Sequence, residues 1–266
     1  MTMSPLQVFL VILCVLGILM HIIALFLLIS VKRCHRIFQR EYLIALCVVE
    51  IWLCVSHSVE ATSNSKDRSI LIDIFSITSF TGVILYQYLL LASIAIDKFI
   101  SIYVPLRYES LSIKRYTRGL MIFYAFVSFS VTAIFISMYF YYEKDYTKVY
   151  QLMGKCIWLP GDIIISITLI MVYGYFAAVR SKLKLLDAWR HLIVSTAILL
   201  SFFLFYLIPD LISIVAEHKV AELSVVFYIM YTLDLICDAL SMTLLNRVFR
   251  NTLKKKLCCT NQIIPL

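Results

Sequence analysis

The sequence predicts an all-α membrane protein, a bundle of seven transmembrane helices that fills most of the 266-residue chain. The first reason is composition: 62% of the residues are hydrophobic and only 15% are charged, whereas about a quarter are charged in a soluble domain. The second reason is that seven apolar segments have about the 20-residue length that a membrane-spanning helix needs. The third is that the basic residues collect on one side of these segments.

The first four spans are expected at residues 6–31, 42–59, 70–103 and 119–142. The first is uncharged and too long for the apolar core of a cleaved signal peptide, so we expect a retained signal anchor. The second carries one acid, Glu50, near its centre. The third has no charge between Asp73 and Asp97, and the fourth has none at all.

The last three spans are expected at residues 157–180, 191–216 and 223–245. The fifth is uncharged from residue 163 to 179, and the sixth is interrupted only by Pro209 and Asp210. The seventh carries two acids, Asp234 and Asp238. Because an ionisable residue at hydrocarbon depth is costly and usually functional, these acids are candidate site residues.

The distribution of Lys and Arg predicts the orientation of the chain. With the N-terminus outside, 18 of these residues lie on the inner side and 6 on the outer side. Basic residues gather on the cytoplasmic side, so we expect an extracellular N-terminus and a cytoplasmic C-terminus in the plasma membrane. The net charge of +8 then indicates attraction to the inner leaflet and no nucleic-acid partner.

The third span ends in Asp97, Lys98 and Phe99, followed by Pro105 and by a Leu-Arg-Tyr that ends at Tyr108. This segment resembles the rhodopsin-like family of G-protein-coupled receptors, which ends its third helix in Asp-Arg-Tyr and often continues with a proline and Leu-Arg-Tyr. The resemblance implies a switch that couples to G proteins, with a looser inactive lock because Lys lacks the planar fork of Arg. The alternative is a helix end whose Lys extends to the membrane surface.

Further segments resemble the same family in the same order. Residues 43–53 resemble its second helix, with Glu50 in the place of an Asp. Residues 202–209 resemble the toggle region of the sixth helix, with Phe203 and Pro209 present and Leu207 replacing a Trp. Residues 238–242 stand where Asn-Pro-x-x-Tyr is expected. The resemblance further implies a membrane-parallel amphipathic eighth helix at residues 246–258. This helix is expected to be lipidated by palmitoylation at Cys258 and Cys259. The receptor domain then covers residues 1–260, and residues 261–266 form a short cytoplasmic tail.

By this resemblance, four buried polar residues form an intramembrane ion or proton site: Glu50, Gln87, Asp234 and Asp238. In the family this pocket holds a sodium ion. Acids that share a low-dielectric site cannot all stay ionised, so a cation or protons must neutralise them. The alternative is that each acid is protonated and only hydrogen-bonds between helices. A lone buried His21 is expected to be satisfied rather than to be a ligand.

The candidate ligand pocket lies at the outer end, with Glu60, Asp73, Phe80 and Asp210. Melanocortin receptors are similar in having acids at the first two positions, where they bind a basic peptide and calcium, so a calcium ion at Glu60 and Asp73 is one expectation. The alternative is that Glu60, Asp67 and Asp73 are solvated loop charges. Asp73 also stands where the family has a disulfide cysteine, so Cys156 is expected to be unpaired. Phe80 occupies the position of the acid that amine receptors need.

The function expected from these features is signal transduction by a receptor, from an extracellular small molecule or peptide to a heterotrimeric G protein. Two alternatives stay open: an uncoupled decoy or chemosensory-type receptor, and a proton or cation transporter that uses Glu50, Asp234 and Asp238. An enzyme is not expected, because no nucleophile–base spacing or metal motif is found in the sequence.

Overall fold

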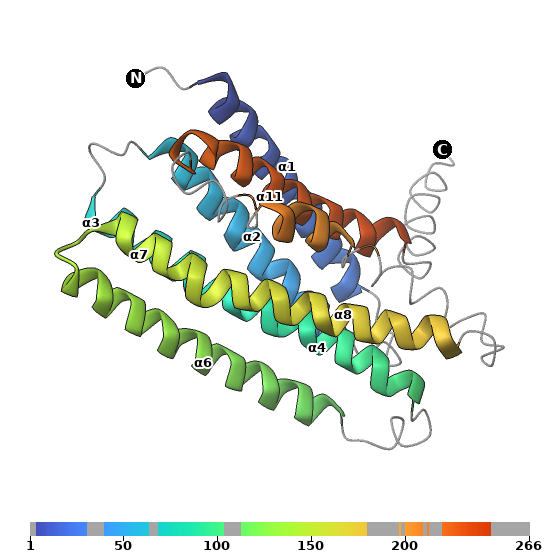
Figure 1. Ribbon diagram of the computed structural model, residues 1–266. Coiled ribbons are helices and arrows are strands. Elements are labelled where there is room, and N and C mark those ends of the chain that lie inside the picture. Colours follow the sequence, from blue (N-terminus) through green and yellow to red (C-terminus); the bar gives the residue numbers. More distant parts are fainter. Residues whose placement is uncertain are drawn as a thin grey trace, which may run out of the picture.

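The computed structural model describes residues 4–30, 40–63, 69–103, 113–179, 197, 200–209, 212 and 220–245. Almost all of these residues are helical, and none of them lies in a strand (Figure 1). The α-helices are α1 (Pro5–Ser30), α2 (Arg40–Thr62), α3 (Ile70–Ile77), α4 (Ile84–Tyr103), α6 (Ile113–Tyr141), α7 (Tyr146–Met153), α8 (Leu159–Val179) and α11 (Val220–Leu240). Four π-helical segments join or extend them: η1 (Thr78–Val83), η2 (Gly154–Trp158), η3 (Phe203–Leu207) and η4 (Ser241–Leu245).

Five helical stretches within the described residues are long and apolar enough to cross a membrane. They are Pro5–Ser30, Arg40–Thr62, Ile70–Asp97, Tyr116–Tyr141 and Val225–Thr243. The all-helical prediction is therefore confirmed for the described part of the chain, which is compatible with a multi-pass membrane protein. The count of seven stays a prediction, because most of the expected sixth span, the eighth helix and the C-terminal tail lie outside the described residues.

Helices α3, η1 and α4 follow one another from Ile70 to Tyr103, over the residues expected for the third span. The helix expected from residue 157 begins earlier, because α7, η2 and α8 continue from Tyr146 to Val179. A tight turn precedes it, with positive φ angles of 55° at Glu143 and 66° at Lys144. Asp145 then caps α7 by accepting a hydrogen bond from the Lys148 backbone N–H. The turn ends α6, and the cap starts the next helix at once.

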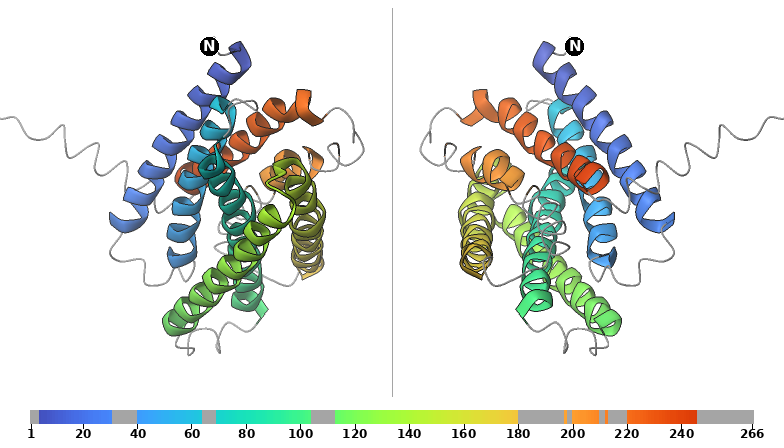
Figure 2. Two further views of the ribbon diagram at one scale, coloured as in Figure 1. Left: turned by 90° about the vertical axis from the view of Figure 1, so that its left-hand side faces the viewer. Right: turned by 90° about the vertical axis from the view of Figure 1, so that its right-hand side faces the viewer.

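Helix α2 lies inside the bundle, packed against α1, α4 and α11. Helices α1 and α6 lie on opposite outer sides (Figures 1 and 2). The outer face of α6 carries large apolar side chains, including Ile122, Phe126 and Phe129, which are 68–74% exposed. Lipid tails cover such a face at no hydrophobic cost, so this exposure suits a membrane helix.

Two glycines permit close helix contacts. A Cβ at Gly82 in η1 would collide with the Thr132 hydroxyl of α6. A Cβ at Gly161 in α8 would collide with the Tyr88 ring of α4. The second contact matters most, because it places Tyr88 beside the buried acid Asp162.

Candidate functional site

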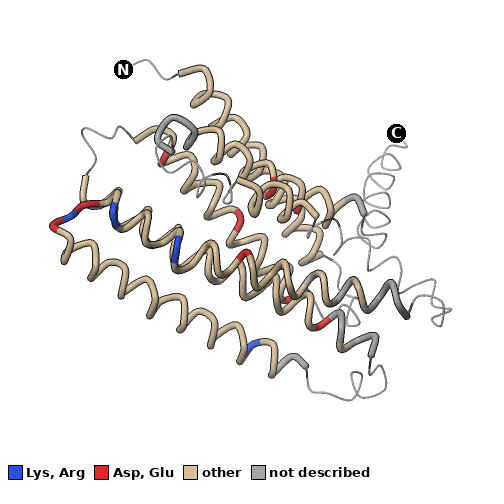
Figure 3. Tube along the Cα trace, in the orientation of Figure 1, with Lys and Arg blue, Asp and Glu red and all other residues tan. Residues whose placement is uncertain are grey.

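Buried polar residues meet in the middle of the bundle and form what we call the acidic cluster: His21 from α1, Glu50 from α2, Gln87 from α4, Ser201, and Asp234 and Asp238 from α11. None of these residues is more than 6% exposed. Figure 3 shows acids along the interior helices, whereas the described Lys and Arg residues lie toward helix ends or on α7 and η2. The sequence-predicted set of Glu50, Gln87, Asp234 and Asp238 is thus brought into one region.

The contacts within the acidic cluster join α1, α2, α4 and α11. His21 Nε2 lies 2.8 Å from the Leu235 carbonyl oxygen of α11, and its Nδ1 lies 3.2 Å from Glu50 Oε2. Glu50 in turn interacts with Asp238 and Gln87. The Ser201 hydroxyl donates to Asp238 Oδ1 over 2.8 Å. His21 is therefore a buried residue with contacts to both α2 and α11.

The carboxyl groups of the acidic cluster are only partly satisfied. Within the described part of the chain, neither oxygen of Glu50 or Asp234 makes a hydrogen bond of standard geometry, and neither does Asp238 Oδ2. Burying an ionised carboxylate without a partner costs on the order of several kcal/mol of folding free energy. The cluster therefore has the chemistry to hold protons or to bind a cation through oxygen atoms. No three His, Cys, Asp or Glu side chains among the described residues have a metal-ligand arrangement.

Asp162 of α8 is a further buried acid, which the sequence reading did not select. It is 0% exposed and accepts a hydrogen bond from the Tyr88 hydroxyl at 2.8 Å. It also interacts electrostatically with Asp234 of the acidic cluster. Tyr88 and Asp162 therefore link the acidic cluster to the group of rings described next.

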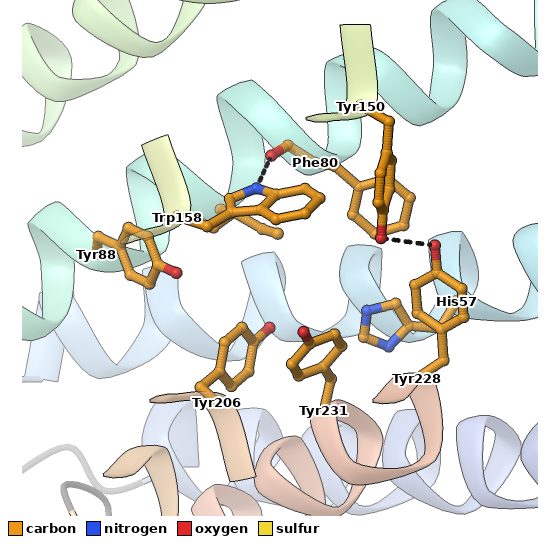
Figure 4. A pocket seen from close by; sticks show the side chains of 9 residues that line it. His57, Phe80, Tyr88, Tyr150, Trp158, Tyr206, Tyr228 and Tyr231 are labelled. Carbon is orange, nitrogen blue, oxygen red and sulfur yellow. Dashed lines mark hydrogen bonds between the residues drawn. The ribbon is translucent and has the colours of Figure 1, made fainter. Parts of the chain in front are cut away.

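Aromatic side chains surround a pocket in the bundle (Figure 4). One wall carries Tyr206, Tyr231, His57 and Tyr228, and the facing wall carries Tyr88, Trp158, Phe80 and Tyr150. Ile84 completes the lining. We call this the ring pocket. Its residues come from α2, α4, α7, α11, η1, η2 and η3, so the pocket touches most helices of the described bundle.

The rings of this pocket pack closely. Tyr206 and Tyr231 have centroids 4.6 Å apart, and Tyr150 meets Trp158 edge-on at 4.8 Å. The Trp158 indole N–H donates to the Phe80 carbonyl oxygen over 2.7 Å. The cavity volume is about 10 Å³, which is room for about one water molecule. The described conformation is therefore a nearly closed pocket.

The acids expected at the outer mouth are held by tyrosines. The Tyr139 hydroxyl of α6 donates to Asp73 Oδ2 over 2.7 Å, and the Tyr146 hydroxyl of α7 donates to Glu60 Oε1 over 3.0 Å. Asp73 is only 6% exposed, so the alternative of a solvated loop charge is wrong for this residue. Cys156 is exposed and forms no disulfide. Of the remaining pocket candidates, Phe80 lines the ring pocket and Asp210 lies outside the described residues.

The predicted switch is described only in part. Asp97 is partly buried near the end of α4, and Lys98 and Phe99 lie in the same helix, with side chains outside the description. Pro105 and Tyr108 lie outside the described residues. So do the lipidation candidates Cys258 and Cys259.

The toggle region differs from the register that the resemblance implied. Phe203 is 41% exposed and so lies on the outer face of η3, while Leu207 and Pro209 are buried. The inward ring comes from Phe202, one residue earlier, which stacks on Tyr206 at 5.3 Å and 10°. The wider π-helical turn shifts which side chains face inward.

Sequence reasoning missed most of the ring pocket. His57 lies seven residues after Glu50, which places both on one face of α2. Tyr228 and Tyr231 share a face with Leu235 through spacings of three and four residues. These spacings could have indicated from the sequence that His57, Tyr228 and Tyr231 face the interior. The positions of Tyr150 and Trp158 could not have been predicted in this way, because they depend on how η2 packs against η1.

The chain was also compared with known proteins. Comparison with protein-family models gives no match, and comparison with curated proteins gives none either.

Proposed function

We propose that this chain is a rhodopsin-like receptor of the plasma membrane that signals to a heterotrimeric G protein. The observation that carries the proposal is the meeting of Glu50 from α2 with Asp238 from α11, the two positions that the resemblance pairs across the bundle. These residues are 188 positions apart in the chain, and both are buried. The ring pocket is linked to the acidic cluster through Tyr88 and Asp162, and its lining comes from several helices, so a ligand contact on one helix can reach others.

The proposed mechanism is a shift between two arrangements of the bundle. A ligand in the ring pocket changes the equilibrium only if it binds one arrangement more tightly than the other. The inner ends of the helices then admit the G protein, with Asp97 and Lys98 at the contact. Lys98 is a point charge with three donors, so it forms a less directional contact than an Arg would.

A sodium ion fits the proposal through the oxygen atoms of the acidic cluster. Glu50, Asp238 and the Ser201 hydroxyl are the groups that would hold it. Its charge would offset the buried carboxylates and so favour the arrangement in which they are close together.

The proposal is tested by binding of purified, nucleotide-free G-protein heterotrimers to the protein in lipid nanodiscs. A receptor retains at least one heterotrimer from the panel more strongly than empty discs do, and guanine nucleotide releases it. Lys98→Ala weakens this retention, while Lys98→Arg keeps or strengthens it. Absence of nucleotide-sensitive retention for the wild type and for Lys98→Arg would contradict the proposal.

A second function, proton or cation transport, is favoured by one observation. Asp162, Asp234, Asp238 and Glu50 are all buried within the bundle, and intramembrane acids often mark ion paths. Flux across proteoliposomes separates the two functions. A transporter moves protons or sodium down a gradient, and the pair of substitutions Glu50→Gln and Asp238→Asn abolishes the flux. A receptor shows the same low flux with and without these substitutions.

A further inference from the structure

The ring pocket contains a buried acceptor that nothing in the described protein satisfies. His57 is 0% exposed and its Nε2 has no hydrogen-bond partner among the described residues. The ring stacks against Phe80 with centroids 6.0 Å apart at 15°, and lies 5.4 Å from the Tyr228 ring. Figure 4 shows the imidazole among these rings, with one nitrogen turned toward the cavity.

The hydrogen bonds around His57 identify which nitrogen carries the proton. Its Nδ1 lies 3.1 Å from Thr232 Oγ1. The Thr232 hydroxyl donates its own hydrogen to the Tyr228 carbonyl oxygen over 2.7 Å, so its oxygen accepts from His57. Nδ1 is therefore the protonated nitrogen of a neutral ring, and Nε2 carries a lone pair. A buried acceptor of this kind is costly unless it finds a donor.

The helices around the pocket depart from regular α-geometry where they reach it. Phe80 lies in η1, Trp158 in η2 and Tyr206 in η3, so three separate π-helical segments each supply a ring to one pocket. Such segments are rare and occur often at functional sites. Their convergence is an observation independent of the unpaired His57 nitrogen.

We infer that the ring pocket binds a small, neutral, flat aromatic molecule that donates one N–H or O–H to His57 Nε2. The inference rests on the proposed function only in that the ring pocket is then the receptor's ligand site. Stacking between the two walls supplies the affinity, and the donor supplies the selectivity. Apart from the neutral imidazole of His57, the lining residues carry no carboxylate, Lys or Arg side chain that would neutralise a charged ligand.

A flat ring enters by separating the two walls. The hydroxyl oxygens of Tyr150 and Tyr228 are 3.4 Å apart, at the limit of a hydrogen bond, so this polar link between the two walls is weak. Tyr150 belongs to α7 and Tyr228 to α11. Entry of the ring therefore moves α7 and η2 relative to α2 and α11.

The test measures equilibrium binding of radiolabelled indole and 1-methylindole to the protein in nanodiscs, with empty discs subtracted to remove partition into lipid. The two probes share a ring system, but only indole has the N–H. Indole is expected to bind saturably and about tenfold more tightly than 1-methylindole, the factor for loss of one buried hydrogen bond. His57→Phe keeps a stacked ring and removes the acceptor, so this variant should bind both probes equally. Phe126→Leu, on the exposed face of α6, is the matched control and keeps the tenfold preference.

Three results would overturn the inference. The first is no saturable binding of indole to the wild type, which would leave the pocket with room for a water molecule only. The second is equal binding of the two probes by the wild type, a result that needs no variant to fold. The third is tighter binding of tetramethylammonium than of indole, which would make the pocket a cation site. None of these measurements involves a G protein, so a loss of coupling leaves the ligand inference intact.

Discussion

Single tyrosine hydroxyls hold buried or partly buried acids at several places in this protein. Each of these hydrogen bonds joins two helices, and the donors and acceptors are Tyr139 and Asp73, Tyr146 and Glu60, and Tyr88 and Asp162. Hydrogen bonds to a charged acceptor are stronger than those between neutral groups. These pairs join α3 to α6, α2 to α7 and α4 to α8. The first two tie helices together near the expected outer end of the bundle, where the described residues form no disulfide, and the third lies deeper, beside the acidic cluster.

The substitution Tyr139→Phe tests this role. It removes the hydroxyl from Asp73 Oδ2 and leaves a buried carboxyl with one partner fewer, so the free energy of unfolding should fall by about 1–3 kcal/mol. Tyr141→Phe is the matched control, because Tyr141 is 80% exposed. Unfolding by denaturant in the same detergent measures both variants. Equal stability of the two variants would show that the Tyr139 hydroxyl does not hold Asp73.

A double-mutant cycle tests the contact between Glu50 and Asp238. Residues in direct contact show interaction energies of about 0.5–3 kcal/mol, so the effects of Glu50→Gln and Asp238→Asn should not add. The control cycle pairs Asp238→Asn with Glu41→Gln, whose carboxylate lies near the exposed Arg118. Additivity in both cycles would contradict a shared site for the two buried acids.

At the scale of elements, the close approach of α8 to α4 depends on the absence of a side chain at Gly161. Gly161→Ala should push the Tyr88 ring aside, weaken its hydrogen bond to Asp162 and lower the unfolding free energy by about 1–3 kcal/mol. Gly174→Ala in the same helix is the control, since a Cβ there meets nothing within 4 Å. If Gly161→Ala had the same unfolding free energy as Gly174→Ala, α8 would be able to shift away from α4 without a loss of stability.

The start of α7 gives a prediction about pH. The Lys148 backbone N–H donates to the Asp145 carboxylate and lowers the pKa of this group below its ordinary value. The cap therefore stabilises the folded protein fully above the unfolded pKa of about 3.9, and this contribution is lost as the pH falls through the lower folded pKa. Asp145→Asn keeps a capping oxygen without the titration, so the difference in melting temperature between wild type and variant should shrink in acid. A difference that does not change with pH would contradict the cap.

At the scale of the whole molecule, apolar length was enough to predict that the described residues are helical and that several helices are long enough to cross a membrane. Helices α3, η1 and α4 cover residues 70–103, the range expected for the third span, where a mostly apolar run lies between Arg68 and Pro105. The early start of α7 was not predicted, since residues 143–156 mix charged and apolar side chains and only the turn and the Asp145 cap reveal the helix. Apolar length is therefore a better guide inside the bilayer than at its surface.

The interior was predictable where its residues are charged and not where they are aromatic. Glu50 and Asp238 stand out in apolar segments, so their importance is visible in the sequence. The rings of His57, Tyr206 and Tyr231 are ordinary components of a membrane helix, and only packing shows that they share a wall. The inward position of Phe202 in place of Phe203 follows from the π-helical geometry of η3, which no spacing in the sequence indicates.

The central claim is that this bundle activates a G protein. The most direct measurement is the rate of guanine-nucleotide exchange by a panel of purified heterotrimers, with wild type, Lys98→Ala and empty nanodiscs compared side by side, each with and without indole. The account predicts exchange above that of empty discs for the wild type with at least one heterotrimer, and a rate near that of empty discs for Lys98→Ala. Exchange by the wild type that never exceeds that of empty discs would contradict the receptor function.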